Sequence, residues 1–575
     1  MKIKRKLAII ILFVGFLTFS FSISSLILNF GVFTHQNYKY IYKKPIFGGE
    51  IQTANAQNWS HAQVISDNVN GTLNWNSNNS YSPSLAVDSS GNLHAVWHDG
   101  TNLEGCGFDY DIFYANYSVA TSLWSHAHVI SDNVNGTINW NTGHSINPSL
   151  TVDDSGNIYV IWEDETNLEG CDTDSDIFYA NYSVTTGMWS HAQVISDNVN
   201  GTANWNNDTS ENAEISINGS GNIHVVWQDR TNLEGCDTDL DIFYANYSVA
   251  TELWSHAQVI SDNVNGTTNW NDYISQNPNI AVDSYGNIHV VWDDKTNLEG
   301  CDTDSDIFYA NYSTATGLWS HAQVISDNVN GTINWNTGHT YYPSIAIDGS
   351  EDLHVVWHDS TDLNGCSNAD YDIFYTTYST ATGLWSQAQV ISDNVNGTTN
   401  WNTGNSFRPS IAIDGSENLH VVWQDLTNLE GCATDYDIFY TNYSTATGLW
   451  SHAQVISDNV NGTTNWNTEN SQNAKITIDG SGSLHVTWQD GTNLEGCEID
   501  FDIFYSKKEA IISPPCPPPP PLPSPLPLPI LVLLTSLPVE GQISSFPQIL
   551  VLPIIASTVF IEAKFLLKKR KESNT

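Results

Sequence analysis

Groups of aspartates recur at short spacing in one segment of the sequence, and they point to metal chemistry. The richest groups place carboxylates at alternate positions, in the spellings CDTDSD and CDTDLD. Carboxylate oxygens gathered on a tight loop are hard ligands of the kind that Ca²⁺ prefers. Ca²⁺ is therefore the candidate cofactor, and the candidate ligands are Asp172, Asp174, Asp176, Asp237, Asp239, Asp241, Asp302, Asp304 and Asp306.

The same aspartates have a structural alternative. No glutamate follows at the twelfth position that an EF-hand loop requires, and four further copies of the segment carry fewer acids. The last aspartate of each group directly precedes the string IFY, where it could form hydrogen bonds with the backbone of a turn. Metal ligation and turn formation both remain open at this stage.

A tryptophan in the motif NWN recurs in a second long segment. An aromatic ring on a loop offers a face on which a sugar can stack, although burial between neighbouring units would also explain it. The candidate ligand-binding residues are Trp75, Trp140, Trp205, Trp270, Trp335, Trp401 and Trp466.

The same segment carries a glycosylation sequon, Asn-Gly-Thr. An exported protein can be glycosylated at such a site, whereas Asn-Gly is also a common turn. The candidate sites are Asn70, Asn135, Asn200, Asn265, Asn330, Asn396 and Asn461.

Histidine and cysteine recur as well, but they do not indicate catalysis. A histidine stands in the strand-like run NLHAVWHD and in most of its copies, where we interpret it as a packing residue. The chain has eight cysteines and no CxxC motif, so separate thiols are expected rather than a zinc site. Every acid is repeated, so no pair of catalytic carboxylates stands out, and the sequence predicts no catalytic residue.

All of these features belong to one repeat. The tryptophan of a WS dipeptide returns every 65 residues, with a single step of 66, at Trp59, Trp124, Trp189, Trp254, Trp319, Trp385 and Trp450. The cysteine of the acidic segment follows the same period. Seven copies with three tryptophans each account for all 21 tryptophans of the chain.

Each copy contains four strand-like runs, rich in Val, Ile, Trp, Tyr and Phe and separated by turn residues. In the first copy they are 59–66, 84–88, 92–99 and 111–118. Four strands in each of seven units predict an all-β fold, a seven-bladed β-propeller, with an open β-solenoid as the alternative. The first run is left over at the amino end, so we expect 59–66 to complete the last blade and close the ring.

The predicted blade also places the candidate residues. If 84–88 is the innermost strand and 59–66 and its equivalents are the outermost, both long segments open on one face. The acidic groups and the NWN tryptophans should then share this long-loop face, where function tends to concentrate.

Charge limits the choice of partner. The chain has 63 Asp and Glu residues against 18 Lys and Arg, a formal net charge of −45. Between Trp59 and Tyr505 the only Lys and Arg residues are Arg230, Lys295, Arg408 and Lys475. A nucleic-acid backbone requires a basic surface, so nucleic acid is excluded as a partner.

The two ends of the chain predict export and a membrane anchor. A basic start, MKIKRK, precedes an apolar run, so 1–35 is expected to be a signal peptide or an amino-terminal anchor, followed by a linker at 36–58. The propeller is assigned to 59–506, a proline-rich stalk to 507–529, and a second anchor with a basic cytoplasmic tail to 530–575. The expected location is the cell surface, with the propeller outside.

The strings PSLAVDSSGNLHAVWHD and PSIAIDGSENLHVVWQD resemble the Asp-box, or BNR-type, repeat of sialidase-like propellers. The whole repeat also resembles uncharacterised prokaryotic, archaeal-like cell-surface propellers. The resemblance implies that an aspartate, Asp88 in copy one, and a glycine, Gly91, hold a hairpin turn. Sialidases bind the substrate carboxylate with three arginines, whereas this propeller has two, which argues against sialidase chemistry of that type.

Three functions remain open. We favour a non-enzymatic, membrane-anchored propeller that binds an extracellular protein or glycan through its long-loop face, with Ca²⁺ as the candidate cofactor. The alternatives are a sialidase-like, glycan-cleaving enzyme and a purely structural component of the cell envelope. An enzyme would need polar residues that differ between blades and converge at the axis, and the near-identity of the copies argues against this.

Overall fold

The computed structural model describes 59–66, 76, 78–101, 109–131, 141, 143–166, 174–196, 206, 208–231, 240–261, 273–296, 304–326, 338–361, 370–392, 402, 404–427, 435–457, 467, 469–492 and 500–510. Contacts divide the chain into two units, Met1–Ile512 and Ser513–Thr575, and the described residues all belong to the first. Within them, no helix is long and apolar enough to cross a membrane. The predicted signal, linker, stalk and anchor segments lie outside the described residues and stay predictions.

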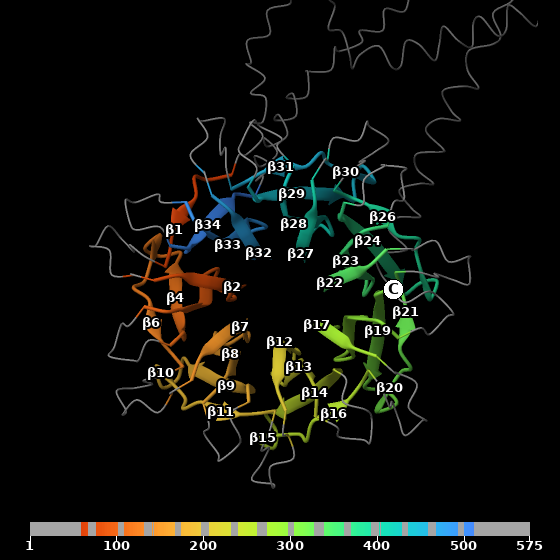
Figure 1. Ribbon diagram of the computed structural model, residues 1–575. Helices are drawn as coiled ribbons and strands as arrows, with labels where there is room; N and C mark the ends of the chain where they lie inside the picture. Colours follow the sequence, from red (N-terminus) through yellow and green to blue (C-terminus); the bar gives the residue numbers. More distant parts are fainter. Residues whose placement is uncertain are drawn as a thin grey trace, which may run out of the picture. The chain divides into compact units, whose positions relative to one another are not determined.

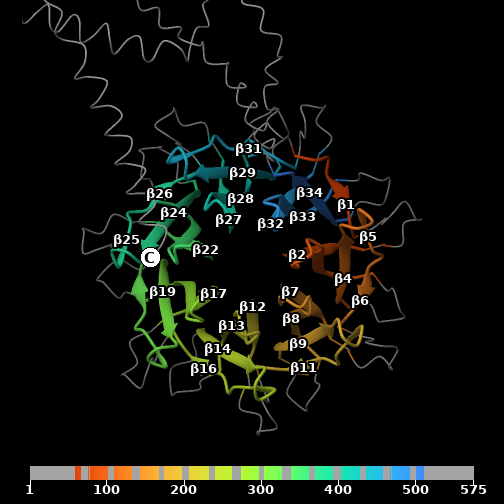
Figure 2. The ribbon, with the colours of Figure 1, turned by 180° about the vertical axis from the view of Figure 1, so that it is seen from behind.

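The described strands form seven antiparallel sheets arranged in a ring (Figures 1 and 2), so the predicted seven-bladed propeller is confirmed and the solenoid is wrong. We number the blades by their inner strands, which are β2 (Ser80–Val87), β7 (Ser145–Val152), β12 (Ser210–Ile217), β17 (Ser275–Val282), β22 (Thr340–Ile347), β27 (Ser406–Ile413) and β32 (Ser471–Ile478). The second strands are β3 (Leu93–Asp99), β8 (Ile158–Asp164), β13 (Ile223–Asp229), β18 (Ile288–Asp294), β23 (Leu353–Asp359), β28 (Leu419–Asp425) and β33 (Leu484–Asp490). The third strands are β4 (Asp111–Ser118), β9 (Asp176–Ser183), β14 (Asp241–Ser248), β19 (Asp306–Ser313), β24 (Asp372–Ser379), β29 (Asp437–Ser444) and β34 (Asp502–Lys508).

The outer edge of each blade differs from its prediction. The run WSHAQVIS is predicted as one strand, but in blades 1 to 6 it forms two short ones that both pair with the third strand. Tyr117 pairs with Trp124 and Tyr114 with His128, so the outer run carries one residue more than its partner between these pairs. This extra residue is a β-bulge, which interrupts the ladder. The outer strands are β5 (Leu123–Trp124), β6 (His128–Val129), β10 (Met188–Trp189), β11 (Gln193–Val194), β15 (Leu253–Trp254), β16 (Gln258–Val259), β20 (Leu318–Trp319), β21 (Gln323–Val324), β25 (Leu384–Trp385), β26 (Gln389–Val390), β30 (Leu449–Trp450) and β31 (Gln454–Val455).

The amino-terminal strand closes the ring, as predicted. β1 (Gln63–Val64) pairs with β34 at the outer edge of blade 7, and the two lie side by side in Figure 1. Beyond the strand, Ser60 N–H donates to the Lys507 carbonyl and Ile65 N–H to the Ile503 carbonyl. Both ends of the repeat region therefore contribute to one blade.

The hydrophobic core lies between neighbouring blades. All seven residues of each second strand are buried, as in β3. Trp97 has no exposed surface and stacks on Phe113, with ring centroids 6.2 Å apart. The cluster that contains Trp97 also includes Ile503 and Tyr505 of blade 7. Because each cluster draws on two blades, no blade can bury its apolar faces alone, as in repeat folds generally.

A chain of polar contacts at one end of five blades continues this contact. In blade 5, Asp348 Oδ1 accepts the N–H groups of Ser350 and Asp352, which holds the turn between β22 and β23. His354 Nε2 lies 3.3 Å from Asp348 Oδ2, and its Nδ1 lies 2.8 Å from the Tyr375 hydroxyl. The Tyr375 ring meets Trp450 of blade 6 edge-on at 5.2 Å. The repeated histidine is therefore a buried structural residue, in agreement with the interpretation from the sequence.

The turns that contain Asp348 and its equivalents define the short-turn face. The opposite, long-loop face is marked by the buried aspartate that ends each second strand. Asp99 accepts hydrogen bonds from the Ser80 hydroxyl, the Trp97 indole and the Thr101 N–H. The inner strand thus begins where the second strand ends, and both predicted long segments are attached at this face.

A candidate binding site at the central channel

A ring of seven unusual backbone positions lies on the inner strands near the long-loop face. The inner strand carries one extra residue there: Tyr81 pairs with His98 and Ser84 with Val96. At each of these bulges one residue has a φ of 49° to 55°, in the left-handed region that side chains disfavour. We call these positions the channel ring: Ser82, Asn147, Asn212, Asn277, Tyr342, Arg408 and Asn473.

The bulge frees a backbone N–H, and the preceding blade accepts it. Asn212 N–H donates to Glu163 Oε1 at 2.6 Å, and Asn473 N–H donates to Gln424 Oε1 at 3.0 Å. The acceptor is always a buried polar side chain of the second strand, at His98, Glu163, Gln228, Asp293, His358, Gln424 and Gln489. These contacts hold the strained backbone and link each blade to the next.

Burial shifts the pKa of the acceptors that titrate. It lowers the pKa of His98 and His358 to about 3, so each ring is neutral near pH 7 and can accept a hydrogen bond at Nδ1. Burial raises the pKa of Glu163 and Asp293 to about 7.

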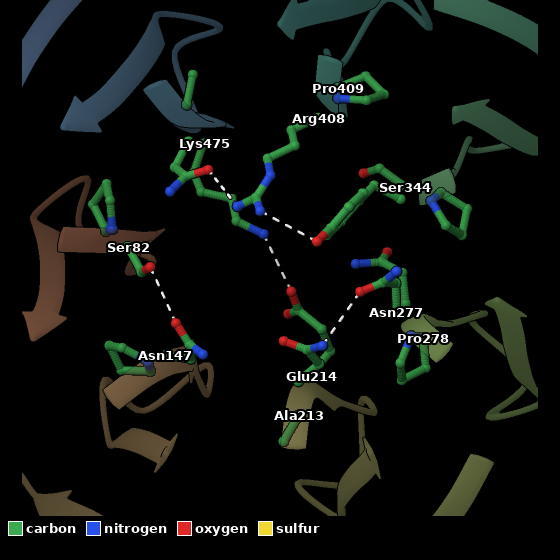
Figure 3. Close-up of a pocket in the computed structure, with 18 residues that line it drawn as sticks. Ser82, Asn147, Ala213, Glu214, Asn277, Pro278, Ser344, Arg408, Pro409 and Lys475 are labelled. Carbon is green, nitrogen blue, oxygen red and sulfur yellow. Dashed lines mark hydrogen bonds and ion pairs between the residues drawn. The ribbon is translucent and has the colours of Figure 1, made fainter. Parts of the chain in front are cut away.

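The channel ring lines a cavity of about 160 Å³ on the axis of the propeller (Figure 3). The one or two residues that follow each ring position complete the lining, among them Glu214 and Lys475. Four asparagines of the ring supply amide groups, which can both donate and accept hydrogen bonds. Ser82 Oγ donates to Asn147 Oδ1, and Asn212 Nδ2 donates to Asn277 Oδ1, so the amides form part of a side-chain network.

Four residues make the channel different in different blades. Lys475 Nζ of blade 7 lies 3.1 Å from Glu214 Oε1 of blade 3, and Figure 3 shows the pair spanning the cavity. Arg408 Nη1 donates to Asn473 Oδ1 at 2.6 Å and Nη2 to the Tyr342 hydroxyl at 3.2 Å. The Arg408 guanidinium also lies 4.5 Å from the centre of the Tyr342 ring, a cation–π contact.

The channel also concentrates positive charge. Arg408 and Lys475 are two of the four Lys and Arg residues between Trp59 and Tyr505. Lys475 is paired with Glu214, whereas Arg408 forms no ion pair with a carboxylate within the described segments. An exposed guanidinium with donors to spare is thus held at the axis of a strongly acidic protein.

These residues correct one expectation from the sequence. The near-identity of the copies was expected to argue against blade-specific polar residues at the axis, yet Glu214, Tyr342, Arg408 and Lys475 converge there. The signal was present in the repeat, because the aligned copies carry different residues at these positions. Each ring residue also directly precedes Pro or Ala, as in Tyr342-Pro343.

The structure describes only some of the predicted metal ligands. Asp172, Asp237, Asp239 and Asp302 lie outside the described residues. Asp176, Asp241 and Asp306 are buried, and each accepts a hydrogen bond from a serine of the outer run, as Asp176 Oδ1 does from Ser196 Oγ at 2.9 Å. Asp174 and Asp304 each lie two residues before the start of a third strand. Within the described segments, no group of three or more His, Cys, Asp or Glu residues is placed to hold a metal.

The other predicted site residues lie outside the part of the chain that the structure describes. All seven NWN tryptophans and all seven Asn-Gly-Thr asparagines lie outside the described residues, as do the repeat cysteines. Asn76, the residue after Trp75, is buried and donates to Asp99 at 2.9 Å. The NWN segment therefore ends against the buried aspartate at the long-loop face.

Comparisons with known proteins find similar solved structures but give no family. No family model and no curated protein matches the sequence. An ulvan lyase of polysaccharide lyase family PL25 is 11% identical, with 77% of this chain and 95% of that chain covered and a TM-score of 0.46. The NanB sialidase of Streptococcus pneumoniae is 11% identical, with 78% and 70% covered and a TM-score of 0.36.

An α-L-arabinofuranosidase, Arb93A of Fusarium graminearum, is also similar. It is 10% identical, with 62% of this chain and 91% of that chain covered and a TM-score of 0.38. At this level the three likenesses concern the propeller architecture and carry no argument about activity. The Asp-box resemblance stays a prediction, although the described turns do use their aspartates in the way it implies.

Proposed function

We propose that this chain is a cell-surface propeller that binds an extracellular protein or glycan at the long-loop mouth of its central channel. The observation that supports this is the convergence of Glu214, Tyr342, Arg408 and Lys475 at the axis. Residues that differ between otherwise similar blades and that together line one cavity indicate a ligand more readily than a structural need. The propeller stands outside the cell in this proposal, anchored through the terminal segments.

A binding assay with charge-matched variants tests the proposal. The full-length chain, in detergent, is titrated with extracellular polysaccharides and with surface proteins of the same cell. Loss of a central residue in an interface typically weakens binding by roughly fivefold to thirtyfold, and we expect this for Arg408→Ala. Arg230→Ala removes the same charge outside the channel and should bind like the wild type. Equal binding by both variants would place the site elsewhere.

A glycan-cleaving enzyme is the second candidate, and the same convergence favours it. Glu214 carries a carboxylate and Tyr342 a phenol, and both face a cavity that could hold a sugar. Release of shortened chains from a bound polysaccharide, abolished by Glu214→Gln, would establish this activity. Binding without any product would favour the non-enzymatic function, and a chain that binds nothing would favour the purely structural role in the envelope.

Ca²⁺ remains the proposed cofactor of the acidic segments in blades 2 to 4. A ligand at ten times its Kd raises the unfolding free energy by about 1.4 kcal/mol, so Ca²⁺ should raise the Tm relative to chelator. Asp172→Asn combined with Asp174→Asn should reduce that rise by the part that comes from blade 2. Asp176→Ala should lower the Tm in chelator as well, because it removes the hydrogen bond to Ser196. Equal losses with and without Ca²⁺ for the double variant would show that these aspartates form turns.

A further inference from the structure

A group of half-buried aromatic rings lies at the long-loop end of blades 5 and 6. Tyr341 and Phe407 are the second residues of their inner strands, and Tyr371 and Tyr436 immediately precede their third strands. The Tyr371 and Phe407 centroids are 5.1 Å apart, and those of Phe407 and Tyr436 are 6.2 Å apart. His358 supports the group from below, 5.1 Å from Phe407 and 5.4 Å from Tyr371. We call Tyr341, Tyr371, Phe407 and Tyr436 the aromatic shelf.

The shelf belongs to particular blades. The positions of Tyr371 and Tyr436 hold Ser175, Leu240 and Ser305 in blades 2 to 4, so no aromatic ring occupies them there. The positions of Tyr341 and Phe407 hold Ile146, Glu211 and Gln276 in the same blades. The fold therefore does not require aromatic rings at these places. Blades 7 and 1 carry a second group, in which Tyr81 lies 5.3 Å from Phe501.

The shelf is continuous with the channel mouth. Phe407 is followed by Arg408 of the channel ring, and Tyr341 by Tyr342. The Tyr342 ring stacks on His358 at 5.6 Å, and His358 also supports the shelf. A ligand that lay over Phe407 and Tyr371 would consequently reach the guanidinium and the ring of amides without leaving the surface.

The chemistry of this surface matches a sugar chain. Pyranose rings present apolar C–H faces, which suit partly exposed aromatic rings, and hydroxyl edges, which need groups that donate and accept. The asparagines of the channel ring and the Tyr342 hydroxyl are such groups. The protein has a net charge of −45 and would repel a polyanionic ligand. A neutral polysaccharide would not be repelled.

We propose that the aromatic shelf and the channel mouth together bind a neutral polysaccharide, with sugar rings over Tyr371, Phe407 and Tyr436 and hydroxyls at the channel ring. The inference rests on the proposed function, because it names the ligand class of the same face. It predicts binding that is insensitive to salt, since no ion pair between ligand and protein forms.

The internal repeats supply the test. Neutral oligosaccharides of gluco, manno and galacto configuration are titrated against the full-length chain in detergent, at low and at high salt. Tyr371→Ser combined with Tyr436→Ser introduces the residue that blades 2 and 4 already carry. We expect the affinity to fall roughly tenfold or more, as for central aromatic residues in other interfaces. Tyr285→Ser, which removes a tyrosine 74% exposed on the short-turn face, should leave binding unchanged.

The outcomes separate this inference from the proposed function. Binding of polygalacturonate alone, weakened by salt, would overturn the neutral class while leaving the channel mouth as the site. Binding of a neutral oligosaccharide that is unchanged by the double tyrosine substitution but weakened by Arg408→Ala would show that the aromatic shelf is not part of the site. Absence of binding to any glycan or protein would overturn both. Should the double variant fail to fold, Phe407→Gln, which copies Gln276, tests the same surface.

Discussion

The two ends of each blade differ in how much they vary along the chain. At the short-turn end, five blades share a chain from turn aspartate to histidine to tyrosine, and the tyrosine contacts the next blade's tryptophan. At the long-loop end the backbone repeats just as closely, since all seven inner strands bulge with a φ of 49° to 55°. The side chains there differ: serine, asparagine, tyrosine and arginine occupy one geometry. The comparison teaches that this propeller keeps its backbone constant and varies what it presents at the axis.

The exceptions at the short-turn end support this division. Blade 2 has Tyr159 in place of the histidine, and its hydroxyl donates directly to Asp153 at 2.9 Å. Blade 3 has Asn218 in place of the aspartate, and its side-chain amide lies 3.2 Å from His224 Nε2. Each substitution preserves a hydrogen-bonded connection. The channel ring keeps the backbone contact to the preceding blade while its side chains differ in size, charge and polarity, which is the pattern expected where residues serve a ligand.

Removing a framework residue should give the largest effect on stability. Trp357 of β23 has no exposed surface, and truncation of a buried tryptophan to alanine costs about 3–5 kcal/mol. We therefore expect Trp357→Ala to lower the unfolding free energy by about that amount. Urea unfolding of the full-length chain provides the measurement. Arg408→Ala, at an exposed channel position, should change it by less than about 0.5 kcal/mol. A similar loss for both variants would contradict the division into framework and channel.

The acceptors behind the channel ring should give opposite pH effects. The folded pKa of His358 is about 3, against 6.5 for the unfolded residue, so only the unfolded state gains the proton between these values. His358 therefore makes stability fall as the pH drops below about 6.5, by at most about 1.4 kcal/mol per pH unit. Glutamine accepts the same N–H in blades 3, 6 and 7. We expect His358→Gln to remove this acid sensitivity and to leave stability at pH 7.5 nearly unchanged.

Glu163 should give the opposite pH dependence of stability. Its folded pKa of about 7 exceeds the ordinary 4.5, so the folded state holds the proton in that interval. Stability attributable to Glu163 is present below pH 4.5 and is lost as the pH rises through about 7. Glu163→Gln should therefore match the wild type near pH 4.5 and exceed it at pH 8. Urea unfolding across this range measures both variants, and parallel pH profiles for the two would show that the acceptors do not titrate as their burial implies.

Much of the fold could be predicted from the sequence because its determinants are repeated. Seven copies of DIFY, and of HVVW or a close variant, show the strands, and the unpaired WSHAQVIS at the amino end predicts the closure by β1. The split of the outer strand was missed because one extra residue leaves no mark in composition. The channel ring was missed for a different reason. Aligning copies emphasises what they share, and Tyr342 or Arg408 disappears among residues that do not recur.

The smallest expected effect comes from a turn where two blades depart from the rest. The position three residues after the turn aspartate, or after Asn218 in blade 3, holds glycine in five blades, and Glu351 and Glu417 in blades 5 and 6. All have positive φ, 85° at Gly91 and 62° at Glu417. Left-handed backbone costs a residue with a side chain about 1–2 kcal/mol, and glycine's greater freedom when unfolded offsets about 0.5–1 kcal/mol of the gain. Glu417→Gly should therefore raise the unfolding free energy by up to about 1 kcal/mol, measured by urea unfolding, without altering binding at the channel. Gly91→Glu should lower it by a similar amount. A destabilised Glu417→Gly would mean that the carboxylate stabilises the turn more than its backbone strains it, for which the 3.4 Å contact to Ser350 Oγ is the candidate.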